Sequence, residues 1–364
     1  MRRRTVLKTG LGVVLGSPLL AALKQSEVDG AINVMKSATE SGQVAGAAMF
    51  VQQNETRITK AFGTASDENA IFLLASISKT ITVTAIMTLF DQQEFQLNDR
   101  VQKFIPEFKG DGREEMTMQQ LFTHTCGLPD QLPENAKLRS SHAELSTFIE
   151  RAIRTPLLFT PGEKYSYSSM GILIATEVAQ RISGKTIATL IDETVFKPLN
   201  MKHSALGVGN LNREALMPCQ ILGAAPESGA GNPSTKSWDW NSTYWRQLGV
   251  PWGGTHGSVG DVGQFLSKFL KHDGKILEPA TSRLMIQNHN RPGLHRRGLG
   301  FDLSSRLNGP KNSKSAFGHT GSTGTLCWAD PESNTICVIL TTLPANAVNP
   351  HPRNLAAAHV AASV

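Results

Sequence analysis

The sequence lacks the short motifs that mark several common functional classes. No G-x-S-x-G, P-loop or dinucleotide-binding fingerprint occurs in it, and His203 and His256 lie in no H-E-x-x-H pattern. The chain has only 4 cysteines in 364 residues, and no two of them form a C-x-x-C pair of the metal-binding type. These absences exclude an α/β-hydrolase nucleophile elbow and the usual nucleotide sites. They also predict that the protein holds no metal and no cofactor.

Long runs of like charge are also missing. The chain has 36 Lys and Arg against 30 Asp and Glu, a net charge of +6. Four of the basic residues fall in the first 22 positions, which contain no acidic residue, so the remainder carries 6 − 4 = +2. No later basic run is interleaved with aromatic residues. We therefore expect no nucleic-acid partner.

The first 24 residues differ from the rest and predict an export leader. Three arginines and a lysine precede an apolar run of about fifteen residues, which is too short and too glycine-rich for a typical membrane span. Arg3, Arg4 and the following TVLK fit a bacterial twin-arginine signal, which predicts a periplasmic or otherwise exported protein. A stray basic amphipathic terminus is the alternative. No clear A-x-A cleavage site occurs near Ala21 and Ala22, so retention of the leader as an anchor stays open.

The stretch 72–89, FLLASISKTITVTAIMTL, contains the strongest chemical signal. Ser76 and Lys79 form an S-x-x-K pair followed by a run with almost no charge, which predicts a buried helix. Residues three apart share a helix face, so the hydroxyl and the amine can meet. A buried lysine with a depressed pKa can activate a serine, and the start of a helix favours developing negative charge. The alternative is an N-cap serine followed by a snorkelling lysine.

Hydrophobic periodicity predicts the remaining regular elements. Helices are expected at 28–40, 171–182, 187–196, 262–272 and 352–363, and strands at 46–52, at 56–62 and within 316–344. Strands at both ends of the chain with helices between them predict an α+β protein. Its antiparallel sheet would be built from both chain ends and flanked by helices, and a mostly helical lobe would span about 91–246.

Two local features leave alternatives open. Residues 222–257 are rich in Gly, Pro, Ser and Trp, which predicts loops whose tryptophans either form an exposed cleft wall or pack inside. Cys327 and Cys337 flank a turn-like DPESN segment and are either paired across a hairpin or free buried thiols.

Six stretches occur in the order found in one enzyme family. They are SISK at 76–79, LFTHTCGLPD at 121–130, PGEKYSYSSMG at 161–171, PLNMKHS at 198–204, GLGF at 298–301 and GHTGSTG at 318–324. In these the chain resembles the serine β-lactamase and penicillin-binding protein family, in particular its class C β-lactamase-like branch, which includes esterases and D-amino-acid peptidases. The resemblance implies a β-lactamase/transpeptidase-like catalytic domain over 25–345, with a C-terminal helix over 346–364 packing on the sheet.

The resemblance also implies roles for individual residues. Ser76 would be the nucleophile and Lys79 its partner. Tyr167, in the family's Y-x-N position, would act as a general base if nearby cations lowered its pKa. The backbone N–H groups of Ser76 and Ser322 would form the oxyanion hole, where each donor contributes about 2.7–4 kcal/mol. Which of Lys79 and Tyr167 is the base stays open, because the pair titrates as a unit.

Ser169, His319, Thr320 and Gly321 are expected to bind substrate, and two of them depart from the family pattern. Ser169 stands where Asn is usual, and His319 stands where Lys is usual, so a permanent cation for a substrate carboxylate is missing. Both departures weaken the expectation of efficient β-lactam turnover. His124, in THTCG, is expected to be structural.

We therefore expect an exported serine hydrolase that acts through an acyl-enzyme on an ester or amide carbonyl. A D-alanyl-type carboxypeptidase or β-lactamase is the first alternative, and a non-catalytic binding protein on the same fold is the second. The expected partner is a small ester, amide or peptide substrate. The protein is expected to be a monomer, attached to a membrane only if the leader is uncleaved.

Overall fold

A computed structural model describes residues 23–304 and 311–364, so the predicted leader lies almost wholly outside the described residues. The main sheet has the strand order β2-β1-β8-β7-β6. Its strands are β1 (Gly46–Gln53), β2 (Thr56–Gly63), β6 (Phe317–Gly321), β7 (Thr325–Asp330) and β8 (Thr335–Thr341). All neighbouring pairs are antiparallel, and β1 from the start of the chain pairs with β8 from its end. The predicted α+β class is confirmed.

Strand β1 is buried along its whole length because both of its faces are covered. Ala47, Met49 and Val51 belong to the hydrophobic cluster on one face, whereas Ala48 and Phe50 belong to the main core on the other. This alternation is what a period of two residues dictates. The sheet that contains β1 therefore lies between two hydrophobic clusters, one on each of its faces.

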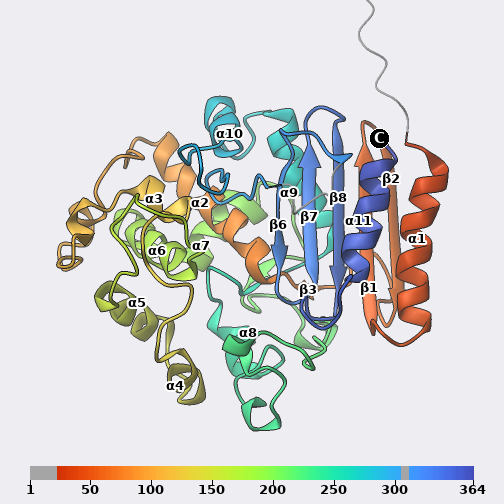
Figure 1. Cartoon of the computed structure of the whole chain (residues 1–364), viewed down its shortest axis with the longest axis horizontal. Helices are drawn as coiled ribbons and strands as arrows, with labels where there is room; N and C mark the ends of the chain where they lie inside the picture. The colour runs from red at the N-terminus through yellow and green to blue at the C-terminus, as the bar shows by residue number, and fades with distance from the viewer. Residues whose placement is uncertain (1–22, 305–310) are drawn as a thin grey trace, which may run out of the picture.

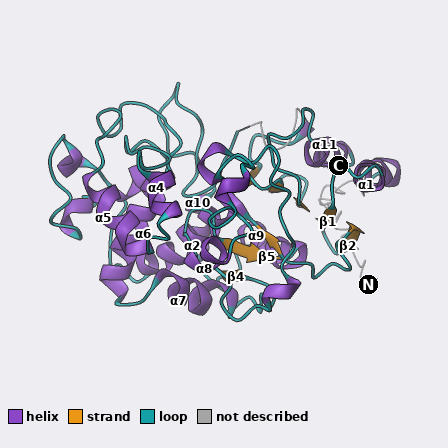
Figure 2. Cartoon of the chain, turned by 90° about the horizontal axis from the view of Figure 1, so that it is seen from below, coloured by secondary structure: helices purple, strands orange, loops and turns teal. Residues whose placement is uncertain are grey.

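Helices α1 (Gln25–Glu40) and α11 (Pro352–Ala362) cover the outer face of the sheet side by side (Figures 1 and 2). They share a hydrophobic cluster with β1 and β8, and the backbone N–H of Lys24 donates to the carbonyl of Ser363 at 2.9 Å. The opposite face packs on α9 (Val259–Lys271). At that contact Phe50 lies so close that a Cβ on Gly263 would be 2.5 Å from its ring.

Most of the remaining helices form the lobe on the left of Figure 1. They are α2 (Ser78–Asp91), α3 (Met118–Phe122), α4 (Asn135–Ser140), α5 (Leu145–Arg154), α6 (Ser169–Ser183), α7 (Ile187–Ile191), α8 (Thr243–Leu248) and α10 (Pro279–Met285). A second sheet, which has the order β3-β5-β4, was not predicted from the sequence. Its strands are β3 (Phe72–Leu73), β4 (Ala205–Leu206) and β5 (Thr255–Gly257). They are two or three residues long, too short to show a period.

Two predicted segments are subdivided in the structure. The helix expected over 72–89 begins only at Ser78, after β3 and a 3₁₀ turn, Ala75–Ile77. The strand signals that begin at 316 are divided between β6 and β7, with a tight turn at 322–324. Gly324 has φ +94° in this turn, a backbone conformation that glycine adopts without strain.

The two open alternatives are settled by burial. Trp238, Trp240, Trp245 and Trp252 are all buried, so the tryptophans of 222–257 pack inside. All four cysteines are buried free thiols. Cys327 belongs to the main core and Cys337 to the outer cluster, so their side chains lie on opposite faces of the sheet and cannot be bridged.

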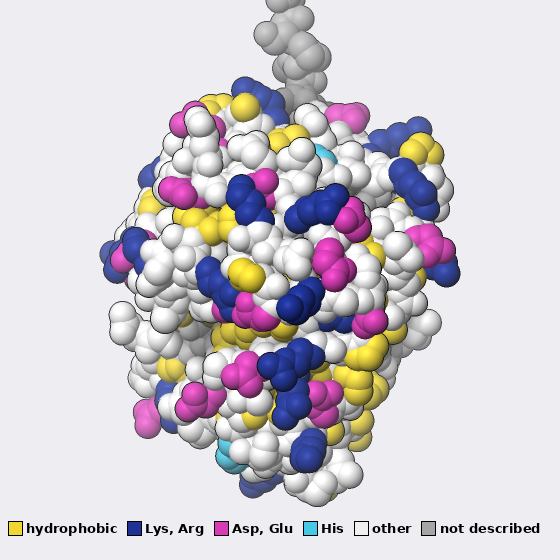
Figure 3. All heavy atoms as spheres, turned by 90° about the vertical axis from the view of Figure 1, so that its left-hand side faces the viewer, with side chains coloured by type: hydrophobic (Ala, Val, Ile, Leu, Met, Phe, Trp, Pro, Cys, Tyr) yellow, Lys and Arg dark blue, Asp and Glu magenta, His cyan; other side chains and the backbone are white. Residues whose placement is uncertain are grey.

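The surface of the helical lobe mixes charges of both signs. Figure 3 shows Lys and Arg interspersed with Asp and Glu rather than gathered into a basic patch on that face. Several are paired, as in Arg181 with Glu107 and Glu177. None of the helices in the described part of the chain is both long and apolar enough to span a membrane.

We predict that Gly324→Ala is strongly destabilising. A Cβ at this position would lie 1.8 Å from the carbonyl oxygen of Leu343, in addition to the strain of a positive φ. Gly42→Ala is the matched control, because Gly42 has φ +76° but open space around it. Urea denaturation should show a loss of about 1–2 kcal/mol for the control and several kcal/mol for Gly324→Ala. Equal losses would contradict the steric argument.

Candidate active site

Ser76 and Lys79 meet at the junction of the two lobes. Ser76 lies in the 3₁₀ turn directly before α2, and Lys79 lies in the first turn of that helix. The amine of Lys79 donates to Ser76 Oγ at 3.1 Å and to the carbonyl of Trp252 at 2.8 Å. The contact predicted between Ser76 and Lys79 is therefore present, although Ser76 precedes the α-helix rather than belonging to it.

Lys79 is completely buried, and its pKa is lowered to about 7. Burial is the largest cause, because a charged amine loses its hydration in the interior. Asp130 and Glu227 raise the pKa of Lys79, whereas the cation of Arg297 lowers it. The amine is therefore close to half-protonated at neutral pH, which suits a group that must accept and return a proton.

Tyr167 lies over the same centre, and the condition on its expected role as a base is that nearby cations lower its pKa. The Lys79 amine is 4.8 Å from the centroid of the ring, and the Arg297 guanidinium is 5.9 Å away. Burial, supported by the charge of Asp130, nevertheless raises the pKa of Tyr167 far above its usual value, although a hydrogen bond with Ser76 opposes this. The two cations do not produce the lowered pKa that a phenolate base needs. The phenol is protonated and can donate.

His319 is neutral, and the cation near it comes from elsewhere in the chain. Burial and the nearby Arg297 lower the pKa of His319 to about 3. Arg297 is itself buried, with Nη2 lying 3.3 Å from His319 Nε2 and 3.0 Å from His124 Nε2. His124 also accepts from the backbone N–H of Ser168 at 3.2 Å, which fits its expected structural role. Arg297 was missed, although it directly precedes the GLGF motif.

Ser169 is engaged by a carboxylate that was also missed. Its hydroxyl donates to Asp130 Oδ1 at 2.5 Å, and its backbone N–H donates to the same oxygen at 3.0 Å. The hydroxyl proton is therefore not free for a substrate, although the oxygen can still accept. Asp130 ends the LFTHTCGLPD motif, and its position there was the available signal.

Ser322 lies in the β6–β7 turn, and its backbone N–H has no acceptor among the described residues. The carbonyl of Gly321, in the same peptide unit, accepts from Arg353 Nη1 at 2.7 Å. Because a peptide unit is planar and trans, fixing this carbonyl points the Ser322 N–H in the opposite direction. Arg353 on α11 therefore fixes the orientation of the expected oxyanion donor.

A pocket of about 240 Å³ opens at Ser76. Ser76, Tyr167, Ser169 and Ser322 line it together with Asp130, Gln131, Arg139, Glu227, Trp240, Trp245 and Trp252. Thus three of the four buried tryptophans of 222–257 also form part of the pocket wall, whereas Trp238 does not line it. His319, Thr320 and Gly321, which were expected to bind substrate, do not line this pocket.

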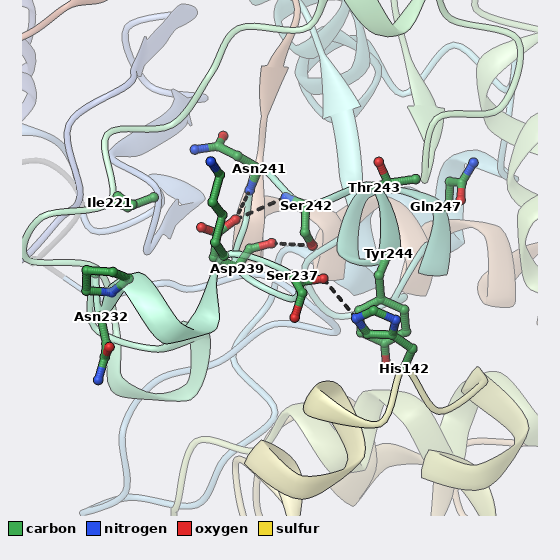
Figure 4. Close-up of a pocket in the computed structure, with 13 residues that line it drawn as sticks. His142, Ile221, Asn232, Ser237, Asp239, Asn241, Ser242, Thr243, Tyr244 and Gln247 are labelled. Atoms are coloured by element: carbon green, nitrogen blue, oxygen red, sulfur yellow. Dashed lines mark hydrogen bonds between the residues drawn. The ribbon is translucent and has the colours of Figure 1, made fainter.

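A larger, open pocket of about 950 Å³ lies among the loops of 221–247 (Figure 4). Neither Ser76, Lys79 nor Tyr167 lines it. Its polar groups are bonded to one another: Asp239 accepts from the backbone N–H groups of Asn241 and Ser242. His142 bonds to the carbonyl of Ser237. Because these groups are already satisfied, this pocket has no side chain that requires a ligand.

Within residues 23–304 and 311–364, no three His, Cys, Asp or Glu side chains are grouped so as to hold a metal ion.

Solved structures show the same fold in hydrolases and penicillin-binding protein homologues. EstCE1, described as a hydrolase with promiscuous acyltransferase activity, is 21% identical with a TM-score of 0.75, covering 92% of this chain and 98% of its own. A family VIII carboxylesterase is 19% identical with a TM-score of 0.75, covering 94% and 98%. A penicillin-binding protein homologue from Caulobacter crescentus is 19% identical with a TM-score of 0.74, covering 94% and 99%.

Sequence relatives extend the same picture. A Salmonella agona (strain SL483) protein named "Putative D-alanyl-D-alanine carboxypeptidase" is 25% identical over 307 residues, which cover 76% of this chain and 70% of the relative. The family model described as Beta-lactamase matches residues 31–362, which include every part of the site described above. The chain belongs to the β-lactamase family of serine hydrolases.

Proposed function

We propose that the protein is an esterase that forms an acyl-enzyme on Ser76. The observation that carries this proposal is the 3.1 Å contact between Ser76 Oγ and a fully buried Lys79 whose pKa is about 7. The neutral amine takes the serine proton while the oxygen attacks the carbonyl carbon of the ester. The tetrahedral oxyanion accepts from the N–H groups of Ser76 and Ser322. When the C–O bond breaks, the proton passes to the leaving alkoxide, and water then releases the acyl group.

Tyr167 completes the proton path as a donor. Its protonated phenol lies next to both Ser76 and Lys79. It donates its proton to the leaving-group oxygen of the ester as the C–O bond breaks, and it takes a proton back from the ammonium of Lys79. In this proposal the amine of Lys79 is the base, and the phenol of Tyr167 relays the proton to the leaving group. The raised pKa of Tyr167 and the lowered pKa of Lys79 support that division.

The charges of the site favour a neutral ester over a carboxylated substrate. Asp130 and Glu227 line the pocket, and His319 is neutral where the family usually has a cation. Arg297 supplies positive charge nearby, but only 1% of it is exposed. A substrate carboxylate, as in a β-lactam or a D-alanyl peptide, would therefore meet two carboxylates in the lining against the single guanidinium of Arg139. The presence of a carboxylesterase among the structural relatives also supports an ester substrate.

The proposal extends to the cellular location. The basic leader with Arg3 and Arg4 supports export through a twin-arginine route.

We predict that a fluorophosphonate labels Ser76 and that a penicillin does not. The reagent phosphonylates an activated serine, whereas the penicillin carboxylate is repelled at this site. Intact-protein mass spectrometry followed by peptide mapping detects each adduct and its position. The Ser76→Ala variant should not be labelled, and its kcat/KM on short-chain p-nitrophenyl esters should fall by at least about a thousandfold. Labelling at another residue would contradict the mechanism, and penicillin acylation of Ser76 would contradict the preference for neutral esters.

We predict that kcat/KM for a neutral ester rises with pH and levels off above an apparent pKa of about 7. The base is the neutral amine of Lys79, so its active fraction grows as pH rises through that pKa. Steady-state rates between pH 5 and 9 test this, and Lys79→Arg, which cannot lose its proton, should abolish the rise together with most activity. A profile that is flat to pH 9 and then rises would instead indicate the phenolate of Tyr167.

We predict that residues 1–24 export a folded reporter in a bacterium with a twin-arginine translocase. Replacing Arg3 and Arg4 together with Lys removes the arginine pair that the receptor reads but keeps the charge. Cell fractionation should then show the reporter retained in the cytoplasm, whereas Arg2→Lys serves as the matched control and should leave export intact. Export of the double variant at the control level would rule out this route.

A further inference from the structure

One end of the pocket at Ser76 contains buried polar atoms that the protein does not satisfy. Arg139 Nη1, Trp245 Nε1 and Gln131 Oε1 have no hydrogen-bond partner among the described residues. All three residues line the pocket. Buried polar groups in native proteins nearly always have a partner, because a group that is buried without one loses its hydration and gains nothing in return. Three such atoms in one small pocket therefore indicate that a bound molecule supplies the partners.

Arg139 is held rigidly in this position. It lies on α4, only 1% of it is exposed, and its Nε donates to Asn135 Oδ1 at 3.1 Å. Its guanidinium stacks on the indole of Trp245, with 3.8 Å between Cζ and the ring centroid. Both residues line the pocket, so the stacked guanidinium and indole belong to the same part of its wall. The wall therefore offers two donors that are fixed before a substrate arrives.

The same end of the pocket also offers acceptors. Gln131 contributes its unpartnered carbonyl oxygen, and Glu227 contributes a carboxylate that has no ion pair or side-chain hydrogen bond among the described residues. Asp130 adds a second negative charge in the lining. Donors and acceptors thus belong to residues that line one cavity, and the positive charge of Arg139 is opposed by two carboxylates.

We propose that the Arg139 end of the pocket binds a neutral polar group of the substrate, a hydroxyl or carboxamide that both accepts and donates hydrogen bonds. This inference rests on the proposed esterase function and specifies its substrate class. A purely alkyl group would leave the three polar atoms unpaired. A carboxylate would be repelled by Glu227 and Asp130, and an ammonium has no acceptor for the donors Arg139 Nη1 and Trp245 Nε1. A hydroxyl avoids both costs, since its oxygen accepts from Arg139 or Trp245 while its proton goes to Gln131 or Glu227.

The size of the pocket restricts the group to a short chain. Its volume of about 240 Å³ is below the roughly 300–1,000 Å³ of sites that hold drug-sized ligands. Trp240, Trp245 and Trp252 form apolar walls beside the polar end. The chain between the ester and the polar group therefore packs on indole rings. The substrate that fits is a short ester with a hydroxyl or carboxamide a few atoms from the reacting carbonyl.

Isosteric esters test this directly. We expect kcat/KM for p-nitrophenyl 3-hydroxybutanoate to exceed that for p-nitrophenyl 3-methylbutanoate, which carries a methyl in place of the hydroxyl, by about tenfold or more. The 3-ammoniobutanoate ester should be no better than the methyl ester. The pair 3-hydroxybutyl acetate and 3-methylbutyl acetate tests the same preference in the alcohol part of the ester. A tenfold higher kcat/KM for the hydroxyl compound in either pair supports the proposal.

Matched variants assign the preference to this end of the pocket. Trp245→Phe removes the indole N–H but keeps an aromatic ring under Arg139, and it should lower the hydroxyl-to-methyl ratio because only the Arg139 donor remains. Gln131→Leu should lower the ratio in the same direction and serves if the first variant folds poorly. Trp238→Phe is the control, because Trp238 is a buried tryptophan of the same loop region that does not line this pocket, and it should leave the ratio unchanged.

The outcomes separate this inference from the proposed function. Turnover of the esters with a ratio near one, or with the ammonium ester preferred, overturns the inference and leaves the esterase intact. A high ratio that Trp245→Phe and Gln131→Leu both preserve also overturns it. Absence of turnover together with absence of fluorophosphonate labelling overturns the proposed function and this inference with it.

Discussion

The burial of the Lys79 amine against Ser76 is the constraint on which the rest of the site depends. Complete burial alone would drive the amine to its neutral form, whereas the carboxylates of Asp130 and Glu227 favour the charged form. Arg297 opposes those carboxylates. The pKa near 7 results from this balance, so the charged residues around the pocket act on the Lys79 amine even where they do not touch it. Replacing any one of them would change the chemistry of Ser76 indirectly.

The contact between Ser76 and Lys79 could be predicted because it is local. Residues three apart in one helical segment must be neighbours, whatever the remaining structure is. Tyr167 could be predicted only through the resemblance, since its ring reaches the pair from a loop nearly ninety positions away in the numbering. Arg297 and Arg139 carry no such signal, because a charged residue in a loop and one in a short helix are usually exposed. Their burial depends on tertiary packing, which the periodicity of hydrophobic residues does not predict.

The same distinction holds for the fold. The strands at the two chain ends could be predicted from alternation and β-branched residues, and their union in one sheet followed from their order in the chain. The small sheet β3-β5-β4 and the turn at 322–324 could not, because two or three residues have no period. This turn nevertheless carries Ser322, so the least predictable piece of backbone contributes directly to the candidate oxyanion hole. Its geometry depends on Gly324 and on the hydrogen bond from Arg353.

Charge compensation also explains why the site can differ from its family without losing a cation. A lysine at position 319 would carry its own positive charge, whereas His319 is neutral and the cation beside it is the buried Arg297. The electrostatic effect on Lys79 persists, since Coulomb interactions act across several ångströms in a poorly hydrated interior. The guanidinium of Arg297 thus acts on the amine of Lys79 through its charge while it stays buried itself.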